Sequence, residues 1–151
     1  MRSLDTTRLW AGHANPLTVH VYPAAYVALV IALYRRDRRL LVAVLGLVAA
    51  GPMLSPRPTD DTAWRTRVVL GERVLLARGG RSALDVLLAA CFTPVPFLTA
   101  RAALRGRRVR TALLTGWMLL GMWLFFGRMA RVYAGATEAE RAAARAGVVG
   151  D

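Results

Sequence analysis

The sequence predicts an all-α membrane protein, a transmembrane bundle of four helices arranged as two antiparallel hairpins, with an interfacial loop between the second and third helices. Hydrophobic residues make up 56% of the 151 residues, the mean hydropathy is +0.38, and only 20% of residues are charged. The charges gather between four apolar stretches that contain almost none. A charged side chain at the centre of a bilayer costs roughly 2.5–3.5 kcal/mol, so a membrane requires this separation.

The four expected spans belong to one membrane domain that covers residues 1–151. Asn15 can cap the first span, and the proline after it suits the first helical position. The second span is short, because at 1.5 Å per residue it reaches about 22 Å against a hydrocarbon core of about 30 Å. Pro94 and Pro96 should distort the third span, in which Cys91 is expected to be a small buried hydrophobe. The expected spans are 16–34, 40–54, 83–100 and 111–126.

Two polar segments complete the chain, the interfacial loop 55–82 and the polar tail 128–151. The loop should contain a short helix that starts near Trp64. Its apolar residues do not share one helical stripe, so we expect it to lie at the membrane interface. The alanine-rich tail is expected to form a helix after Tyr133. Residues that offer an N-cap for the loop helix are Asp60, Asp61 and Thr62.

All 21 basic residues are arginines, and the net charge is +12. In a soluble protein this charge would suggest nucleic acid. Here the arginines flank apolar spans, so we expect a lipid bilayer with anionic headgroups as the partner, and no nucleic acid. The turns 35–39 and 101–110 hold nine arginines, and this density favours cytoplasmic turns in the cell membrane. The twelve arginines elsewhere favour the reverse orientation.

Four spans would place the N-terminal arm, the central loop and the C-terminal tail on one side of the membrane. Most of the specialised polar residues belong to these three segments, so we expect them to form a single polar face. The candidate binding residues on this face are Asn15, Arg57, Trp64, Arg67 and Arg73.

Several short motifs on this face resemble those of a family of small prokaryotic multi-pass membrane proteins, a domain of unknown function. Ser55 departs from that family, which tends to have Asn there, and Gly127 stands where an acidic residue would precede Arg-Met. The resemblance covers about residues 10–133, and it implies a multi-pass fold and no particular reaction. The motifs that carry it are His13-Ala14-Asn15-Pro16, Pro56-Arg57, Trp64 and Leu70-Gly71-Glu72-Arg73.

The candidate catalytic residues are His13 and Glu72. His13 could act as a general base or a metal ligand, because imidazole titrates near neutral pH; the alternative is an interfacial side chain beside a helix cap. Glu72 could hold a substrate together with Arg67 or Arg73, or belong to an ion-pair network. A catalytic zinc needs three protein ligands, and His20 lies two helical turns further along. We therefore expect no metal and no cofactor.

The leading hypothesis is a non-enzymatic membrane protein, structural or partner-binding, whose polar face binds another membrane protein or a second copy of the chain. The alternative is a membrane-embedded enzyme or binder that acts on a lipid or an anionic headgroup. In that case His13 would be the base, and Arg57, Arg67 and Arg73 would hold phosphate. A small transporter subunit is a third hypothesis, but a single marginal carboxylate in four spans gives a poor ion path.

Overall fold

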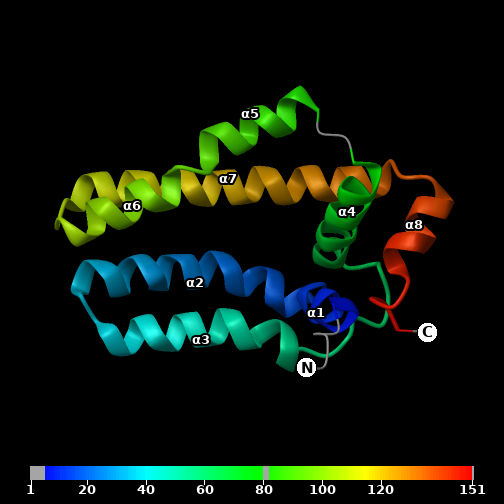
Figure 1. Cartoon of the computed structure of the whole chain (residues 1–151), viewed down its shortest axis with the longest axis horizontal. Helices are drawn as coiled ribbons and strands as arrows, with labels where there is room; N and C mark the ends of the chain where they lie inside the picture. Colours follow the sequence, from blue (N-terminus) through cyan, green and yellow to red (C-terminus); the bar gives the residue numbers. More distant parts are fainter. Residues whose placement is uncertain (1–5, 80–81, 151) are drawn as a thin grey trace. The chain divides into compact units, whose positions relative to one another are not determined.

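The computed structural model describes residues 6–79 and 82–150, and this part of the chain is helical without strands. The predicted all-α class is therefore confirmed. In chain order the helices are α1 (Thr6–His13), α2 (Pro16–Arg35), α3 (Arg38–Leu54), α4 (Trp64–Arg78), α5 (Ala83–Phe92), α6 (Val95–Leu104), α7 (Arg108–Ala134) and α8 (Glu138–Arg145) (Figure 1).

The helix ends differ from the predicted spans where charge or proline was used to place them. The third expected span consists of two helices, α5 and α6, because the chain turns at residues 93–94. The arginine-rich turn is limited to residues 105–107, and α7 continues past residue 126 to Ala134. Charged residues limit what a bilayer accepts, but they do not by themselves end a helix, since arginine has a high helix propensity.

The chain divides into two compact units. Unit 1 consists of Met1–Val21, Ala49–Gly80 and Phe126–Asp151, and unit 2 consists of Tyr22–Val48 and Arg81–Phe125. Unit 1 thus joins the N-terminal arm, the central loop and the tail, the three segments that were expected to form one polar face.

The central helix of unit 1 is α4, with α8 packed against it (Figure 1). A helix with buried residues around its circumference shows no single apolar stripe, so the sequence pattern reflects enclosure of α4 by its neighbours. The core of unit 1 also includes Tyr133 from α7 and Val148 from the tail, both buried. The buried residues of α4 are Thr66, Val68, Val69, Leu70, Gly71 and Val74.

The start of α4 corrects the capping prediction. Its N-cap is Ala63, and no side chain caps it. Asp60 instead accepts hydrogen bonds from the backbone N–H and the hydroxyl of Thr62, at 2.8 and 2.5 Å. An aspartate so close to a helix start can stabilise its own turn in place of the helix.

Two glycines allow helices of unit 1 to approach closely. A Cβ atom on Gly12 of α1 would collide with the backbone carbonyl of Pro52 in α3. A Cβ atom on Gly71 of α4 would collide in the same way with the backbone carbonyl of Met129 in α7. Only glycine permits backbone contact at these two positions.

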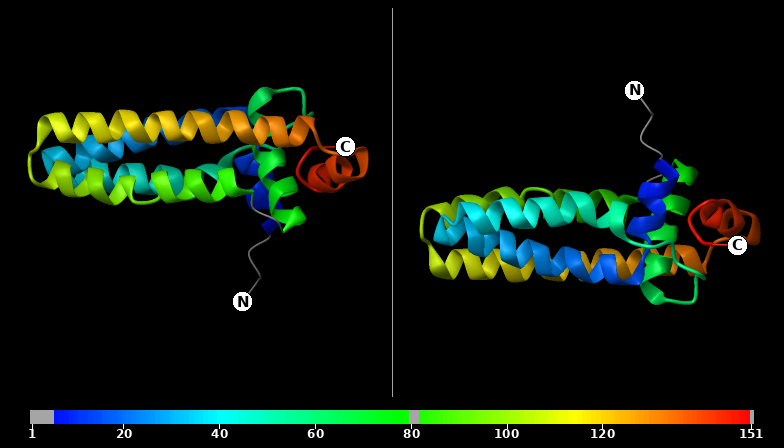
Figure 2. Two further views of the ribbon diagram at one scale, coloured as in Figure 1. Left: turned by 90° about the horizontal axis from the view of Figure 1, so that it is seen from above. Right: turned by 90° about the horizontal axis from the view of Figure 1, so that it is seen from below.

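Polar contacts join the helices of unit 2 at one end. Arg36 Nη2 donates to the carbonyl of Leu104 at 3.4 Å, and Arg108 Nε donates to the hydroxyl of Tyr34 at 3.0 Å. The turn between α2 and α3 therefore lies at the same end of unit 2 as the turn between α6 and α7, as both views in Figure 2 show.

Apolar side chains are exposed along the helices of unit 2. Ala83–Leu104, with 22 residues, and Arg108–Ala134, with 27, are long and apolar enough to cross a membrane, and Val21–Arg35 is a shorter apolar stretch. Only 11% of the most apolar window of each long stretch is buried. Cys91 is exposed, so the prediction of a buried cysteine is wrong. Other exposed apolar residues here are Val86, Leu87, Phe97, Leu113 and Trp123.

Candidate functional site

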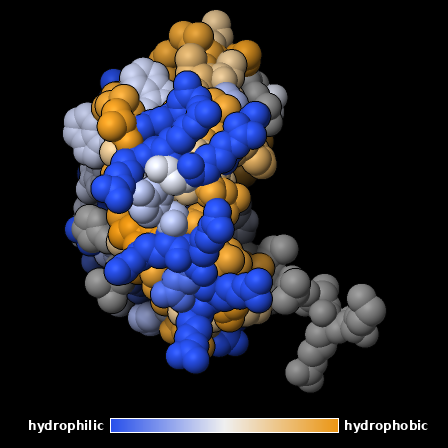
Figure 3. Space-filling view, turned by 90° about the vertical axis from the view of Figure 1, so that its left-hand side faces the viewer, coloured by the Kyte–Doolittle hydropathy of each residue, from blue (hydrophilic) through white to orange (hydrophobic). Residues whose placement is uncertain are grey.

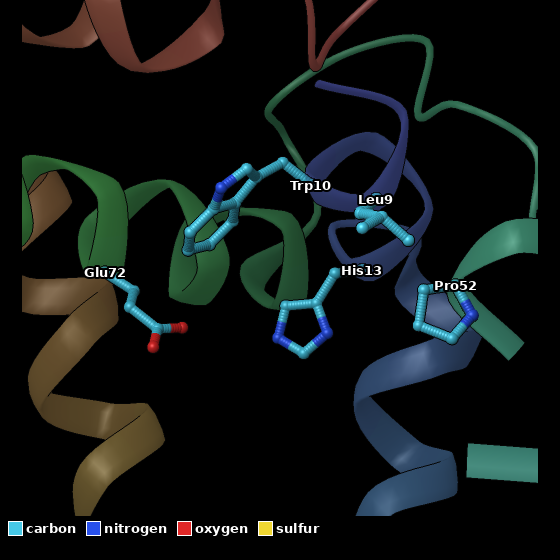
Figure 4. A pocket seen from close by; sticks show the side chains of 5 residues that line it. All are labelled: Leu9, Trp10, His13, Pro52 and Glu72. Atoms are coloured by element: carbon cyan, nitrogen blue, oxygen red, sulfur yellow. The ribbon is translucent and has the colours of Figure 1, made fainter. Parts of the chain in front are cut away.

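Unit 1 contains a pocket of about 260 Å³ that brings the two candidate catalytic residues together. His13 is the last residue of α1, and Glu72 lies in the middle of α4. Figure 4 shows the imidazole and the carboxylate exposed to the same space, with the indole of Trp10 beside them and the ring of Pro52 on the far side of His13. Leu9 completes the lining, which is mostly apolar.

Burial drives both titratable groups of the pocket toward their neutral forms. It lowers the pKa of His13 and raises the pKa of Glu72. Within the described residues, the Glu72 carboxylate has no hydrogen bond or ion pair. A carboxyl group without partners in an apolar pocket destabilises the folded protein when it is ionised. A bound molecule that donates a hydrogen bond to the Glu72 carboxylate would offset this cost.

Aromatic contacts hold one wall of the pocket. The rings of Trp10 and His13 meet edge to face, with their centroids 6.2 Å apart. The Arg73 guanidinium lies over the Trp10 ring, 5.9 Å from its centroid. Arg73 Nη1 also donates to the carbonyls of Ala144 and Ala146 at 2.7 and 3.2 Å. Arg73 thereby joins the pocket wall to the end of α8, where exposed carbonyls favour a cation.

The other candidate binding residues mostly hold backbone segments together. Asn15 Nδ2 donates to the carbonyl of Pro56 at 3.0 Å, and Arg67 Nε donates to the carbonyl of Asp61 at 2.9 Å. Arg57 and Trp64 are exposed and do not line the pocket.

The structure does not assemble the phosphate-binding set of Arg57, Arg67 and Arg73. Arg67 and Arg73 are six residues apart on α4, so their side chains leave the helix about 120° apart. Arg73 also reaches the end of α8, whereas Arg67 binds the loop before α4. An anion held jointly by these arginines is therefore not supported.

Sequence reasoning missed a set of polar contacts that joins α4 and the loop before it to the C-terminal part of unit 1. The Tyr133 hydroxyl donates to Asp61 Oδ2 at 2.6 Å, and Arg145 Nη1 lies 3.4 Å from the same oxygen. Arg78 donates twice to the Glu140 carboxylate, at 2.8 and 3.0 Å. The only local indication in the sequence was the mixture of acidic and arginine residues after Tyr133.

Asp85 and Glu140 also stabilise the starts of helices. Asp85 forms a capping box with Ser82 at the start of α5, and Glu140 forms one with Thr137 at the start of α8. In the described part of the chain, no three histidine, cysteine or acidic side chains cluster as a metal site would require. The side chain of His20 lies outside the described residues.

Comparison with known proteins adds no relative. No family model, curated protein or solved structure matches this chain. The hypotheses about its function therefore depend on its sequence and structure alone.

Proposed function

We propose that the chain is a multi-pass protein of the cell membrane, in which four apolar segments cross the bilayer as two antiparallel hairpins. The observation that carries this proposal is the outward apolar surface of the two long helical stretches. Only 11% of their most apolar windows is buried, whereas the core helix of a soluble protein is mostly buried. Exposed apolar surface of this extent needs lipid or another protein to cover it.

We further propose that unit 1 is the part that acts on one side of the membrane, as a structural or partner-binding head. Its support is that most of its candidate polar residues hold backbone segments together. Asn15 and Arg73 each donate to a carbonyl of another segment, and Arg67 donates to a carbonyl of the loop before its own helix. Such bonds give a firm surface to a membrane protein partner or a second copy of the chain.

Single-cysteine labelling tests the four spans. In a Cys91→Ser background, a cysteine is placed at Arg35 or Arg105, in the two arginine-rich turns, or at Thr59 or Ala139, in two segments of unit 1. We expect a membrane-impermeant maleimide to label the first pair from one side and the second pair from the other. Labelling of Arg35 and Thr59 positions from the same side would contradict four spans, and release of the protein by alkaline carbonate would contradict membrane insertion altogether.

The alternative function is a membrane-embedded enzyme or binder that acts on a lipid or an anionic headgroup, and the pocket shared by His13 and Glu72 favours it. His13→Ala and Glu72→Gln should then change the lipid composition of expressing cells relative to wild type, without loss of membrane accumulation. Glu138→Gln, at a carboxylate that is 71% exposed, is the matched control. Lipid profiles that are identical for wild type and both variants would favour the structural head.

A further inference from the structure

Unit 2 contains a second pocket, of about 500 Å³, at the end that carries both turns. Four arginines line it, and Leu98, Ala102 and Leu114 provide an apolar floor. We call it the arginine pocket. Figure 3 faces this end and shows hydrophilic side chains gathered over it, with hydrophobic surface around them. The four arginines are Arg101, Arg105, Arg107 and Arg110.

Helix geometry directs these side chains into one space. Arg101 and Arg105 are four residues apart at the end of α6, so they share a helix face. Arg110 lies in the first turn of α7. Gly106, with φ of 67°, provides the left-handed residue that ends α6 and reverses the chain. The reversal places the two arginine-bearing helix ends on either side of the pocket.

The positive charge of this pocket is not neutralised within unit 2. Asp37 accepts from the backbone of Leu40 at 3.0 Å, and Asp85 is engaged in its capping box, so the described acids of this unit serve helix starts. Arg36 and Arg108 are used in contacts between helices. The guanidinium groups of the four pocket arginines, in contrast, form no hydrogen bond or ion pair with any described residue.

Four guanidinium groups around one space repel each other, and this repulsion opposes folding unless an anion enters. Guanidinium binds phosphate through paired N–H donors, which gives both charge and geometric match. The apolar floor adds contact for a carbon skeleton attached to the phosphate. If these arginines were only solvated one by one, they would not need to line a common pocket with an apolar floor.

We propose that the arginine pocket binds a phosphate-bearing anion with at least two negative charges. Two sources share this chemistry, the headgroup of an anionic lipid and a soluble phosphate compound. The lipid source rests on the proposed membrane insertion, because only then does this end of unit 2 meet headgroups. The site differs from the expected set of Arg57, Arg67 and Arg73, which belongs to unit 1.

Binding is tested on the full chain in a neutral maltoside detergent, by isothermal titration with dioctanoyl phosphatidic acid, sodium pyrophosphate and dioctanoyl phosphatidylcholine. The pocket variant is Arg105→Gln with Arg110→Gln. The matched control, Arg35→Gln with Arg39→Gln, removes the same charge from the other turn, outside the pocket. We expect the pocket variant to weaken binding of a phosphate probe at least tenfold, and the control to weaken it less than twofold.

The probes separate the two sources. Tight binding of phosphatidic acid with weak binding of pyrophosphate identifies a lipid headgroup, and the reverse identifies a soluble anion. Equal losses in the two variants, or binding of phosphatidylcholine as strong as that of phosphatidic acid, would overturn the site, as would no binding of any probe. Because the titration uses detergent-solubilised protein, it is independent of the number of spans, which the cysteine labelling measures separately.

Discussion

The hydroxyl of Tyr133 donates to Asp61 Oδ2 at 2.6 Å and so connects the end of α7 to the loop that precedes α4. These residues are 72 positions apart in the chain. Arg145, from α8, reaches the same carboxylate oxygen. One aspartate thus joins three segments of unit 1, and it does so with a charge-assisted hydrogen bond, which is stronger than a neutral one.

Tyr133→Phe removes this bond and keeps the ring in the core. Hydrogen bonds to charged groups contribute roughly 1.5–3 kcal/mol, so we expect unit 1 to lose about 1–2 kcal/mol of unfolding free energy, since Asp61 is partly solvated. Thermal melting in detergent measures the loss. Tyr34→Phe, at an exposed hydroxyl that accepts from Arg108, is the control and should change stability by less than about 0.5 kcal/mol. Equal effects of the two variants would contradict the special role of Asp61.

Glu72→Gln should stabilise the protein at neutral pH. Burial raises the pKa of Glu72 above its ordinary value of 4.5, so the folded state holds a proton that the unfolded state releases. As pH rises from about 4.5 through the folded pKa, wild type therefore loses stability, and the loss remains above it. The variant lacks this loss, and the difference in melting temperature between variant and wild type should grow over that pH range.

His13 should show the opposite pH dependence. Burial lowers its pKa below 6.5, so the unfolded state binds the extra proton as pH falls. The stability contribution of this residue is present above pH 6.5 and declines as pH falls toward the folded pKa. His13→Ala should flatten that decline in a melting series from pH 7.5 to about 5. A series parallel to that of wild type would show that His13 is not desolvated in the pocket.

Gly71→Ala should be among the most destabilising single changes in the chain. The added Cβ meets the backbone carbonyl of Met129, which cannot move without displacing α7 from α4. We expect a loss of about 3 kcal/mol or more, beyond the usual range for overpacking. Gly116→Ala is the control, since a Cβ atom there meets only open space, and its expected effect is a gain of about 0.5–1 kcal/mol from helix propensity. Similar melting temperatures for the two variants would contradict the close contact.

Substitutions at the positive-φ residues of the two turns of unit 2 should change stability in opposite directions. Both turns have the hydrogen bonds of a Schellman motif. The backbone N–H of the residue with positive φ, Arg36 or Gly106, donates to the carbonyl three residues earlier. The backbone N–H of the next residue, Asp37 or Arg107, donates to the carbonyl five residues earlier. Arg36 has φ of 55°, a conformation that costs a side-chain-bearing residue about 1 kcal/mol. Gly106→Ala should thus lower stability by about 1 kcal/mol, and Arg36→Gly should raise it by up to a similar amount, reduced by loss of the contact with Leu104. Chemical denaturation in mixed micelles measures both.

The class of the fold could be predicted from the sequence because long apolar runs and helix-compatible residues are local features. The start of α2 at Pro16 and the end of α3 at Leu54 agree with the predicted bounds. The predicted span 111–126 ends too early, because α7 continues to Ala134: charge limits insertion into a bilayer but does not end a helix. Four spans and their hairpin pairing remain predictions.

The site could be predicted only in part. The four predicted spans suggested that the N-terminal arm, the central loop and the tail meet, and unit 1 does contain all three, with His13 and Glu72 lining one pocket. The contacts of Asp61 could not be predicted, since its partners lie 72 and 84 residues away and no local pattern identifies them. The arginine density of the turns was visible, but its convergence on one space depends on Gly106 and on the relative phase of α6 and α7.

Unit 1 is assembled from the beginning, the middle and the end of the chain, and this has a consequence for biosynthesis. Val148 is buried against α4, and the backbone N–H of Gly150 donates to the carbonyl of Pro58 at 2.9 Å. The ribosome must therefore have made and released the chain as far as Gly150 before this unit can close, whereas the two turns of unit 2 can form as soon as they emerge. Until then the groups that Val148 will cover stay open to chaperones and proteases, so unit 1 is accessible to quality control for longer than the turns of unit 2 are.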